Sequence, residues 1–448
     1  MKNQILIFLL LCLAFAAAAQ KMTLEECVVY AIDHNPNLKS VQLDEEINVA
    51  RIKEVKGGAL PQISANGRYS NNFALAEQLL PGEIVGGEPG TTVPVTFGVA
   101  NMLTGQIEVN QVIFNKSLIT GMKAAKASQD LIALNTFAVK EELIYNIAQA
   151  YLQLQINQEQ TQLLTGNLDR VNKLIDISQI QFEEGIIKKI DVDQLRVNRT
   201  NLLSQIQNVE IGITQSKNLL KFYMGMPQNE NIEVENFEQN TSRVELQPTL
   251  DLRANTNLRL LDQQYALKEL DLEANHAGYY PTLSAFANYG FQGQTAKIFS
   301  SDPANDIQTS PTGLYGLQLS IPIFDGLQRH RRSDQIRIEQ MQIRLNRQYA
   351  TNSVEMEFAN ANENLRQNKT LIDAQRENMN LAEELYEVTR MSYREGVAPL
   401  TELLNAETSL QEAQAQYLTA TLQLNIAELD HLRTSGQLAK LIRTESGE

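Results

Sequence analysis

The sequence predicts a mixed α and β fold in which long α-helical hairpins alternate with membrane β-strands, and in which this arrangement occurs twice in one chain. Three features predict it. Two copies of about 210–220 residues align with each other, short segments in each copy alternate apolar and polar residues, and each copy has a proline-free stretch of more than 60 residues. The 448 residues carry 53 acidic against 38 basic side chains, which argues against a nucleic-acid-binding protein because such a protein needs a basic surface.

Residues 1–19 have the composition of a secretory signal peptide, with a charged start, an apolar run and an alanine-rich end. We expect cleavage after Ala19 and export of the chain. No later segment approaches the ~20 consecutive apolar residues of a transmembrane helix. The remaining classes are a soluble exported protein, a surface-attached protein, and a protein that crosses a membrane as β-strands.

The duplication divides the chain into two fused copies of one large unit. Residues 58–61 (GALP) correspond to 278–281 (GYYP), and residues 182–185 (FEEG) correspond to 393–396 (YREG). The predicted order is a first repeat at 20–230, a linker at 231–248, a second repeat at 249–436 and a C-terminal tail at 437–448.

Each repeat opens with a helical stretch, at about 24–56 and 249–276. Pro61 and Pro281 follow the ends of these stretches. Proline cannot continue a helix and is tolerated as the first residue of a strand, so both prolines mark a helix-to-strand transition.

Four segments then alternate apolar and polar residues over about ten positions, with aromatic residues toward their ends: 61–73, 103–114, 281–292 and 314–324. This pattern is typical of a membrane β-barrel wall, although a soluble hairpin with one wet face has the same period. Phe286 breaks the pattern on the polar face, and Pro322 interrupts the fourth strand, where it is tolerable only at a rim. Loops are expected at about 74–100 and 293–312.

Asn115 and Asp325 follow the strand pairs and are good helix N-cap residues. The proline-free stretches after them, 117–183 and 327–394, could each reach ~100 Å as helices. Both stop at a glycine, Gly185 or Gly396, where the chain turns into a return helix. The return helices, the first reaching about 224, carry heptad stripes, which in the second repeat join Leu403, Leu410, Tyr417 and Leu424 with alanines three positions later.

Four strands cannot close a barrel, and an open sheet edge in lipid leaves backbone groups unsatisfied at several kcal/mol each. Two chains would give an eight-stranded barrel, whose interior is filled by its own side chains. Three chains give a twelve-stranded barrel, which leaves an open lumen. A trimer is therefore the smallest symmetric assembly with an open pore.

The repeated order of helix, strand pair, helix, glycine turn and helix resembles the TolC-type outer membrane efflux proteins. The residues that carry the resemblance are Leu24-Glu25-Glu26 through Asn35-Pro36, the two prolines at 61 and 281, and the glycines at 185 and 396. The resemblance implies a homotrimer with a 12-stranded β-barrel in the Gram-negative outer membrane and a periplasmic α-barrel. It also implies docking to a periplasmic adaptor protein and to an inner membrane pump of the RND or ABC type. Such a channel is not an enzyme and needs no cofactor.

In the resembled family the periplasmic end is closed by links between helices and by rings of acidic residues. Alignment on Gly396 places Glu402 and Asn405 at the two ring positions and Tyr393 at a tyrosine of the closing network, while Ala398 replaces an expected arginine. Asp191 is the first-repeat equivalent of Glu402. Three copies of each carboxylate near an axis would favour cations. The alternative is that both are helix-start carboxylates stabilised by the helix dipole. The glycine turns are also where the adaptor is expected to dock.

Nothing in the sequence has the spacing of a catalytic or metal site, and the four histidines are scattered. A basic run at Arg329-His330-Arg331-Arg332 could contact anionic lipid or pair with acidic residues of other helices. The favoured function is an export channel for small molecules. A protein-secretion channel and a soluble secreted coiled-coil protein are the alternatives.

Overall fold

The computed structural model describes residues 21–237, 250–297, 306–438 and 441. The predicted signal peptide at 1–19 lies outside the described residues, as do most of the predicted linker and most of the C-terminal tail. The chain forms two compact units, one of Met1–Glu45, Leu131–Gln263 and Arg344–Glu448, the other of Glu46–Asp130 and Gln264–Ile343. Among the described residues, no helix has both the length and the apolar character needed to cross a membrane.

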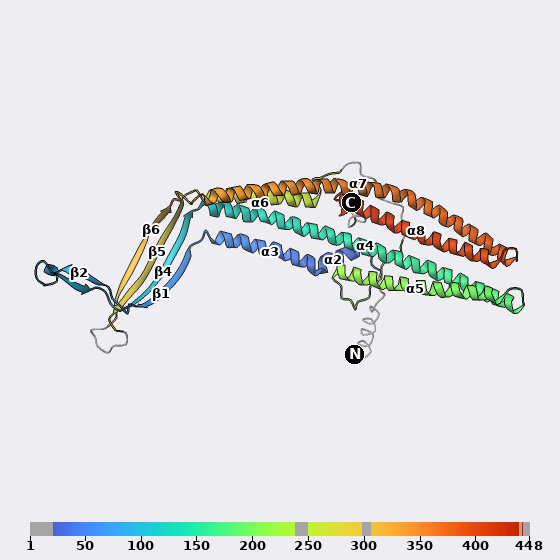
Figure 1. Ribbon diagram of the computed structural model, residues 1–448, viewed down its shortest axis with the longest axis horizontal. Coiled ribbons are helices and arrows are strands. Elements are labelled where there is room, and N and C mark those ends of the chain that lie inside the picture. The colour runs from blue at the N-terminus through green and yellow to red at the C-terminus, as the bar shows by residue number, and fades with distance from the viewer. Residues whose placement is uncertain (1–20, 238–249, 298–305, 439–440, 442–448) are drawn as a thin grey trace, which may run out of the picture. The chain divides into compact units, whose positions relative to one another are not determined.

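The second unit contains a four-stranded antiparallel sheet (Figure 1). Its order is β1-β4-β5-β6, with β1 at Gln62–Asn71, β4 at Asn101–Phe114, β5 at Thr282–Thr295 and β6 at Gln308–Ser320. Pro61 and Pro281 directly precede β1 and β5. Each copy of the duplication therefore contributes two neighbouring strands, and the copies meet where β4 pairs with β5.

The register places the apolar residues of all four strands on one face of the sheet. Ala65 is paired with Ile107, Ile107 with Tyr289, and Tyr289 with Gly313. The next row, on the opposite face, reads Asn66, Gln106, Gly290 and Thr312. Side chains on the apolar face are exposed within the chain, Ile63 at 71% and Tyr289 at 69%. One face of the sheet is thus suited to hydrocarbon and the other to water.

Two phenylalanines on the sheet fit against glycines of the neighbouring strand. Phe286, the aromatic residue on the polar face, is paired with Gly316, where an added Cβ would lie 3.0 Å from its ring. On the apolar face, a Cβ at Gly105 would lie 2.7 Å from the ring of Phe291. The missing side chains make room for the rings, so Phe286 is accommodated without a break in the strand.

The strands differ from the prediction at the ends that face away from the helices. The expected loop at 74–100 contains a hairpin of β2 (Glu77–Pro81) and β3 (Thr92–Thr96), which its many Pro and Gly residues concealed. β6 begins at Gln308, earlier than the predicted 314, and it ends before Pro322, which therefore interrupts no strand. Pro311 is inside β6, where it is tolerated because β6 is an edge strand of the described sheet.

The expected helix at 24–56 is two helices, α2 (Leu24–His34) and α3 (Pro36–Gly57). The break falls at Asn35, because Pro36 lacks the N–H that would continue α2. Asn35 stabilises the break from both sides: its Nδ2 donates to the carbonyl oxygen of Tyr223 at 2.7 Å, and its Oδ1 accepts from the backbone N–H of Leu38 at 2.9 Å.

The long helices are α4 (Lys116–Glu183) and α5 (Lys189–Met224) in the first repeat, and α6 (Thr256–Ala277), α7 (Gln328–Arg394) and α8 (Leu400–Thr434) in the second. The side chain of Asn115 caps α4 by accepting from the N–H of Leu118 at 3.1 Å. Asp325 is not the N-cap of α7 as predicted, because Gly326 and Leu327, both left-handed, intervene. Its carboxylate instead accepts from the N–H of Arg329 at 3.2 Å.

In the first unit, α4 and α5 form one antiparallel hairpin and α7 and α8 form another (Figure 1). The heptad stripe predicted on α8 is buried throughout, with Leu403 at 0% and Tyr417 at 3% exposure, as are the four alanines that accompany it. A shared core of Leu174, Leu195, Tyr386, Leu403 and Leu410 joins the two hairpins toward their tips.

Candidate functional site

The tips of the two helical hairpins have the same backbone geometry. Gly185 and Gly396 have positive φ values of 74° and 73°. The N–H of Ile186 bonds to the carbonyl oxygen of Gln181 at 2.8 Å, and the N–H of Val397 bonds to that of Ser392 at 2.9 Å. This is the Schellman arrangement, in which a left-handed residue closes the end of a helix, and glycine adopts it without strain.

The three polar candidates at the helix starts have different surroundings. Asp191 is half-buried, and its Oδ2 accepts from the backbone N–H of Lys188 at 3.0 Å, so it caps α5. Glu402 lies in the first turn of α8 and, like Asn405, is exposed. Of the two candidate carboxylates, Glu402 is therefore the solvent-exposed one, whereas Asp191 has the helix-start role of the alternative interpretation.

Tyr393 connects the two hairpins. It lies at the end of α7 and is 7% exposed. Its hydroxyl lies 3.3 Å from the Oγ of Ser178 and 3.3 Å from the Oε1 of Gln181, and both of these residues belong to α4. The structure thus brings Tyr393 to the first repeat, while no contact between Tyr393 and the other three candidates is present among the described hydrogen bonds.

A buried polar cluster lies farther from the tips, between α4, α7 and α8. Glu407 is 1% exposed, and its Oε1 lies 3.9 Å from the Nη2 of Arg170. The Arg170 guanidinium lies 5.4 Å from the centre of the Tyr386 ring and also bonds to Asn167. Burial and the nearby Glu407 carboxylate raise the pKa of Tyr386 to about 12, so this phenol stays neutral.

Sequence reasoning missed this cluster. The only signal was Glu407 directly after Ala406 of the α8 heptad stripe, a position where a charged residue is usually exposed. The partner Arg170 is 237 residues away in the sequence, so nothing local linked the two. Together with Tyr393, the cluster holds the second hairpin to α4, because a buried charge cannot leave its partner without a large desolvation cost.

No group of three or more His, Cys, Asp or Glu side chains arranged to hold a metal ion occurs in the part of the chain that the structure describes. The candidate site therefore consists of the exposed Glu402, the helix-capping Asp191, the two glycine turns and the contacts between the hairpins.

Comparison with known proteins identifies the family. Residues 28–226 and 252–434 match the outer membrane efflux protein family. The outer membrane protein TolC of Salmonella enteritidis is 21% identical over 452 residues, which cover 96% of this chain and 87% of that protein. The alkaline protease secretion protein AprF of Pseudomonas aeruginosa is 26% identical over 200 residues, which cover 42% of this chain and 39% of that protein.

Solved structures share the fold. The Campylobacter jejuni CmeC outer membrane channel superposes with a TM-score of 0.73 at 15% identity, covering 94% of this chain and 89% of that one. The open-state Neisseria gonorrhoeae MtrE outer membrane channel superposes with a TM-score of 0.72 at 17% identity, covering 93% and 89%. The predicted fold class is confirmed: duplicated helical hairpins with four membrane strands in each chain.

Proteins of this family are trimeric channels of the Gram-negative outer membrane with a periplasmic extension, and they interact with periplasmic adaptor proteins and inner membrane pumps. They are channels rather than enzymes. The match selects the channel over the soluble coiled-coil protein that the sequence left open. With both repeats matched along most of their length, the chain belongs to the outer membrane efflux protein family.

Proposed function

We propose that this chain forms a passive conduit for small molecules, which the adaptor and pump deliver to it and which leave the cell through its outer membrane barrel. The energy for export comes from the pump, and the chain itself catalyses no reaction. The observation that carries the proposal is the pair of hairpin tips with the same geometry, whose hairpins are joined near the tips by Tyr393 and farther along the helices by Arg170 and the buried Glu407. Contacts of this kind can hold a periplasmic entrance narrow and release it.

Within this channel we assign the constriction to Asp191, Tyr393, Glu402 and Asn405, and adaptor docking to the turns at Gly185 and Gly396. Glu402 has the strongest support as a selectivity residue, because its carboxylate is exposed, whereas that of Asp191 accepts a backbone hydrogen bond. Three copies of Glu402 around a threefold axis attract cations and repel anions.

Planar-bilayer recordings test this assignment. Glu402→Gln removes three charges from the trimer and should lower the ratio of cation to anion permeability severalfold, while Glu402→Asp keeps the charge and should keep the ratio. A ratio that is the same in both variants and in the unaltered channel removes Glu402 from the selectivity site.

A second function, export of a protein substrate, is supported by the similarity to AprF, which is named as a protease secretion protein. The two functions can be separated in cells that lack this chain. Restoring it lowers the accumulation of small fluorescent dyes if it serves small-molecule efflux, and restores release of a polypeptide if it serves secretion.

A further inference from the structure

Two helices next to the edge strands of the sheet carry exposed apolar faces that the chain itself does not cover. β1 and β6 are the edge strands of the described sheet; α3 leads into β1, and α7 follows β6. In a closed trimer the β6 edge of one copy adjoins the β1 edge of the next. The helices beside those edges, α7 of one copy and α3 of the next, are then neighbours too.

On α3 the inward face is occupied: Asn48 is buried, and its Oδ1 accepts from the Ser128 hydroxyl of α4 at 2.8 Å. Another face carries Leu43 and Ile47, 55% and 61% exposed, followed seven residues later by Glu54. Steps of four and seven residues keep these three side chains on one side of the helix. Within the part of the chain that the structure describes, Glu54 makes no ion pair.

α7 has a matching pattern. Its inward face includes Ser333, which is buried and lies 2.9 Å from the Nδ2 of Asn275 on α6. On the far side lie Arg331, then Ile338 and Met341, both 61% exposed. Their spacing of seven and three residues again defines one side of the helix.

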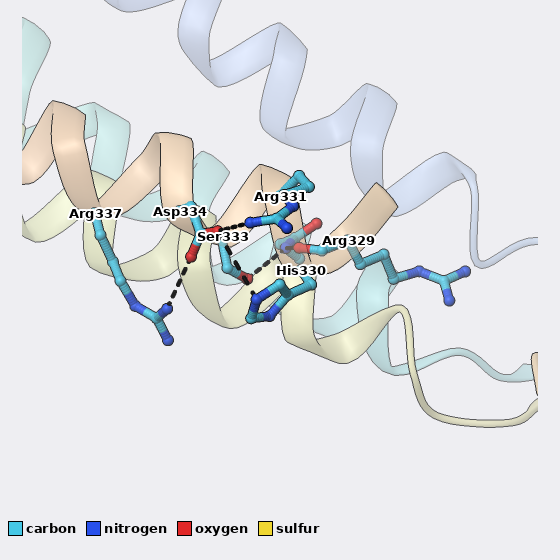
Figure 2. Close-up of polar contacts among 7 residues, drawn as sticks. Arg329, His330, Arg331, Ser333, Asp334 and Arg337 are labelled. Carbon is cyan, nitrogen blue, oxygen red and sulfur yellow. Dashed lines mark hydrogen bonds and ion pairs between the residues drawn. The ribbon is translucent and has the colours of Figure 1, made fainter. Parts of the chain in front are cut away.

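Arg331 has hydrogen-bonding capacity to spare. Its guanidinium is 72% exposed, and its carboxylate neighbour is Asp334, at 3.4 Å. That single carboxylate is also approached by His330 at 3.8 Å and Arg337 at 3.4 Å (Figure 2). Arg329 extends away from Asp334 (Figure 2), and its guanidinium pairs with Asp325 at 3.3 Å. The first turns of α7 therefore have more positive charge than their own acidic residues balance.

The two faces match position by position when the helices run antiparallel. Glu54 is three residues before Gly57, the end of α3, and Arg331 is three residues after Gln328, the start of α7. Ile47 and Ile338 are each ten residues from those same ends, or about 15 Å along the helix. Glu54 then lies opposite Arg331 near the sheet, and Ile47 lies opposite Ile338 farther from the sheet.

We propose that α3 of one copy packs antiparallel on α7 of the next, with Glu54 paired to Arg331 of the neighbouring copy and Ile47 against Ile338. The pair fixes the axial register of adjacent subunits just below the membrane wall. This inference rests on the trimer of the proposed function and adds the contact that aligns its subunits.

Disulfide cross-linking in native outer membranes tests the register. The double variant Ile47→Cys/Ile338→Cys should give covalent dimers and trimers on oxidation. The control Val49→Cys/Ile338→Cys should not, because Val49 is also exposed but lies on another side of α3. If the protein is trimeric by mass and the first variant gives no covalent oligomer, the inference fails and the proposed channel stands. If the protein is monomeric, both fail.

Charge exchange tests the ion pair. Glu54→Lys and Arg331→Glu should each lower the temperature at which the trimer dissociates in detergent, and the two together should recover most of the loss. Arg332→Glu is the control, because Arg332 instead bonds to Gln335 of its own chain, and Glu54→Lys should not rescue it. If Arg331 instead binds anionic lipid, Glu54→Lys fails to rescue Arg331→Glu as well, and that result overturns the pair.

Discussion

At the scale of single residues, the contacts between the two hairpins near their tips agree with the resemblance at one position and differ from it at another. Tyr393 is at the position that the resemblance assigned to a closing tyrosine, and its hydroxyl contacts α4. The methyl side chain of Ala398 can make none of the hydrogen bonds or ion pairs of the arginine that the resemblance leads one to expect. An ionic contact between the hairpins is made elsewhere, by Arg170 of α4 and the buried Glu407 of α8.

Tyr393→Phe should favour the open channel. The substitution keeps the ring in its core and removes only the hydroxyl contacts to Ser178 and Gln181, which together are worth about 1 kcal/mol, or roughly a fivefold change in an equilibrium. Open probability in planar bilayers measures the effect. Tyr349→Phe, on the same helix but 78% exposed, should change nothing. If the two variants had the same open probability, the Tyr393 hydroxyl would not contribute to keeping the channel closed.

His431 gives the folded protein a dependence on pH. It is fully buried on α8 beside Phe358, and burial, followed by the positive charge of Lys369, lowers the pKa of its imidazole below 6.5. The unfolded chain therefore binds a proton on this imidazole more tightly than the folded chain does. The contribution of His431 to the free energy of unfolding is complete above pH 6.5 and declines as the pH falls below that value.

His431→Leu should flatten this part of the pH profile, and the exposed control His276→Gln should leave it unchanged. Thermal unfolding followed by circular dichroism between pH 7.5 and pH 5 measures the slope. A slope that survives His431→Leu would assign the effect to other groups.

At the scale of elements, the four strands form one wall because the registers of three pairings agree. A slip of one residue in any pairing would turn one strand's apolar side chains to the water-facing side. Phe286 against Gly316 and Phe291 against Gly105 oppose such slips, since a shifted ring would meet a side chain in place of a glycine. The alternation itself could be read from the sequence, but these ring-to-glycine contacts could not, because they join different strands.

Labelling from the lipid phase should mark the apolar face of the sheet. Single cysteines at Tyr69, Ile107, Tyr289 and Leu319 should react with a membrane-soluble probe and resist a water-soluble one. Cysteines at Asn66, Gln106 and Thr312 should show the reverse preference, because they belong to the other face. A sheet whose two faces label alike would not be a membrane wall.

The helices were predictable for a physical reason: the long stretches contain no proline, each ends at a glycine that can adopt a left-handed conformation, and the return helices carry apolar residues at heptad spacing. The predicted boundaries of strands and helices were wrong where the local sequence fits more than one structure. The hairpin of β2 and β3 is rich in turn residues, and the left-handed Gly326 and Leu327 displace Asp325 from the cap position. The Arg170–Glu407 cluster joins distant residues, which no local pattern reveals.

At the scale of the whole molecule, both tips should contact the periplasmic adaptor. Cysteines introduced at Ile187 and Ala398, each two residues beyond a tip glycine, should cross-link to a co-expressed adaptor. A cysteine at exposed Ile63, on the apolar face of the sheet, should not. If neither tip gives an adduct while the trimer is intact, the adaptor binds elsewhere on the helices.

Duplication within one gene also gives the channel a freedom that identical subunits lack. A ring of six half-length chains would carry the same residue at all six ends. Here Phe182 occupies the place that Tyr393 has in the other copy, and it is 37% exposed with no hydroxyl. Fusion has let the two halves specialise: the second hairpin supplies the tyrosine, and the first hairpin supplies Ser178 and Gln181, which contact its hydroxyl.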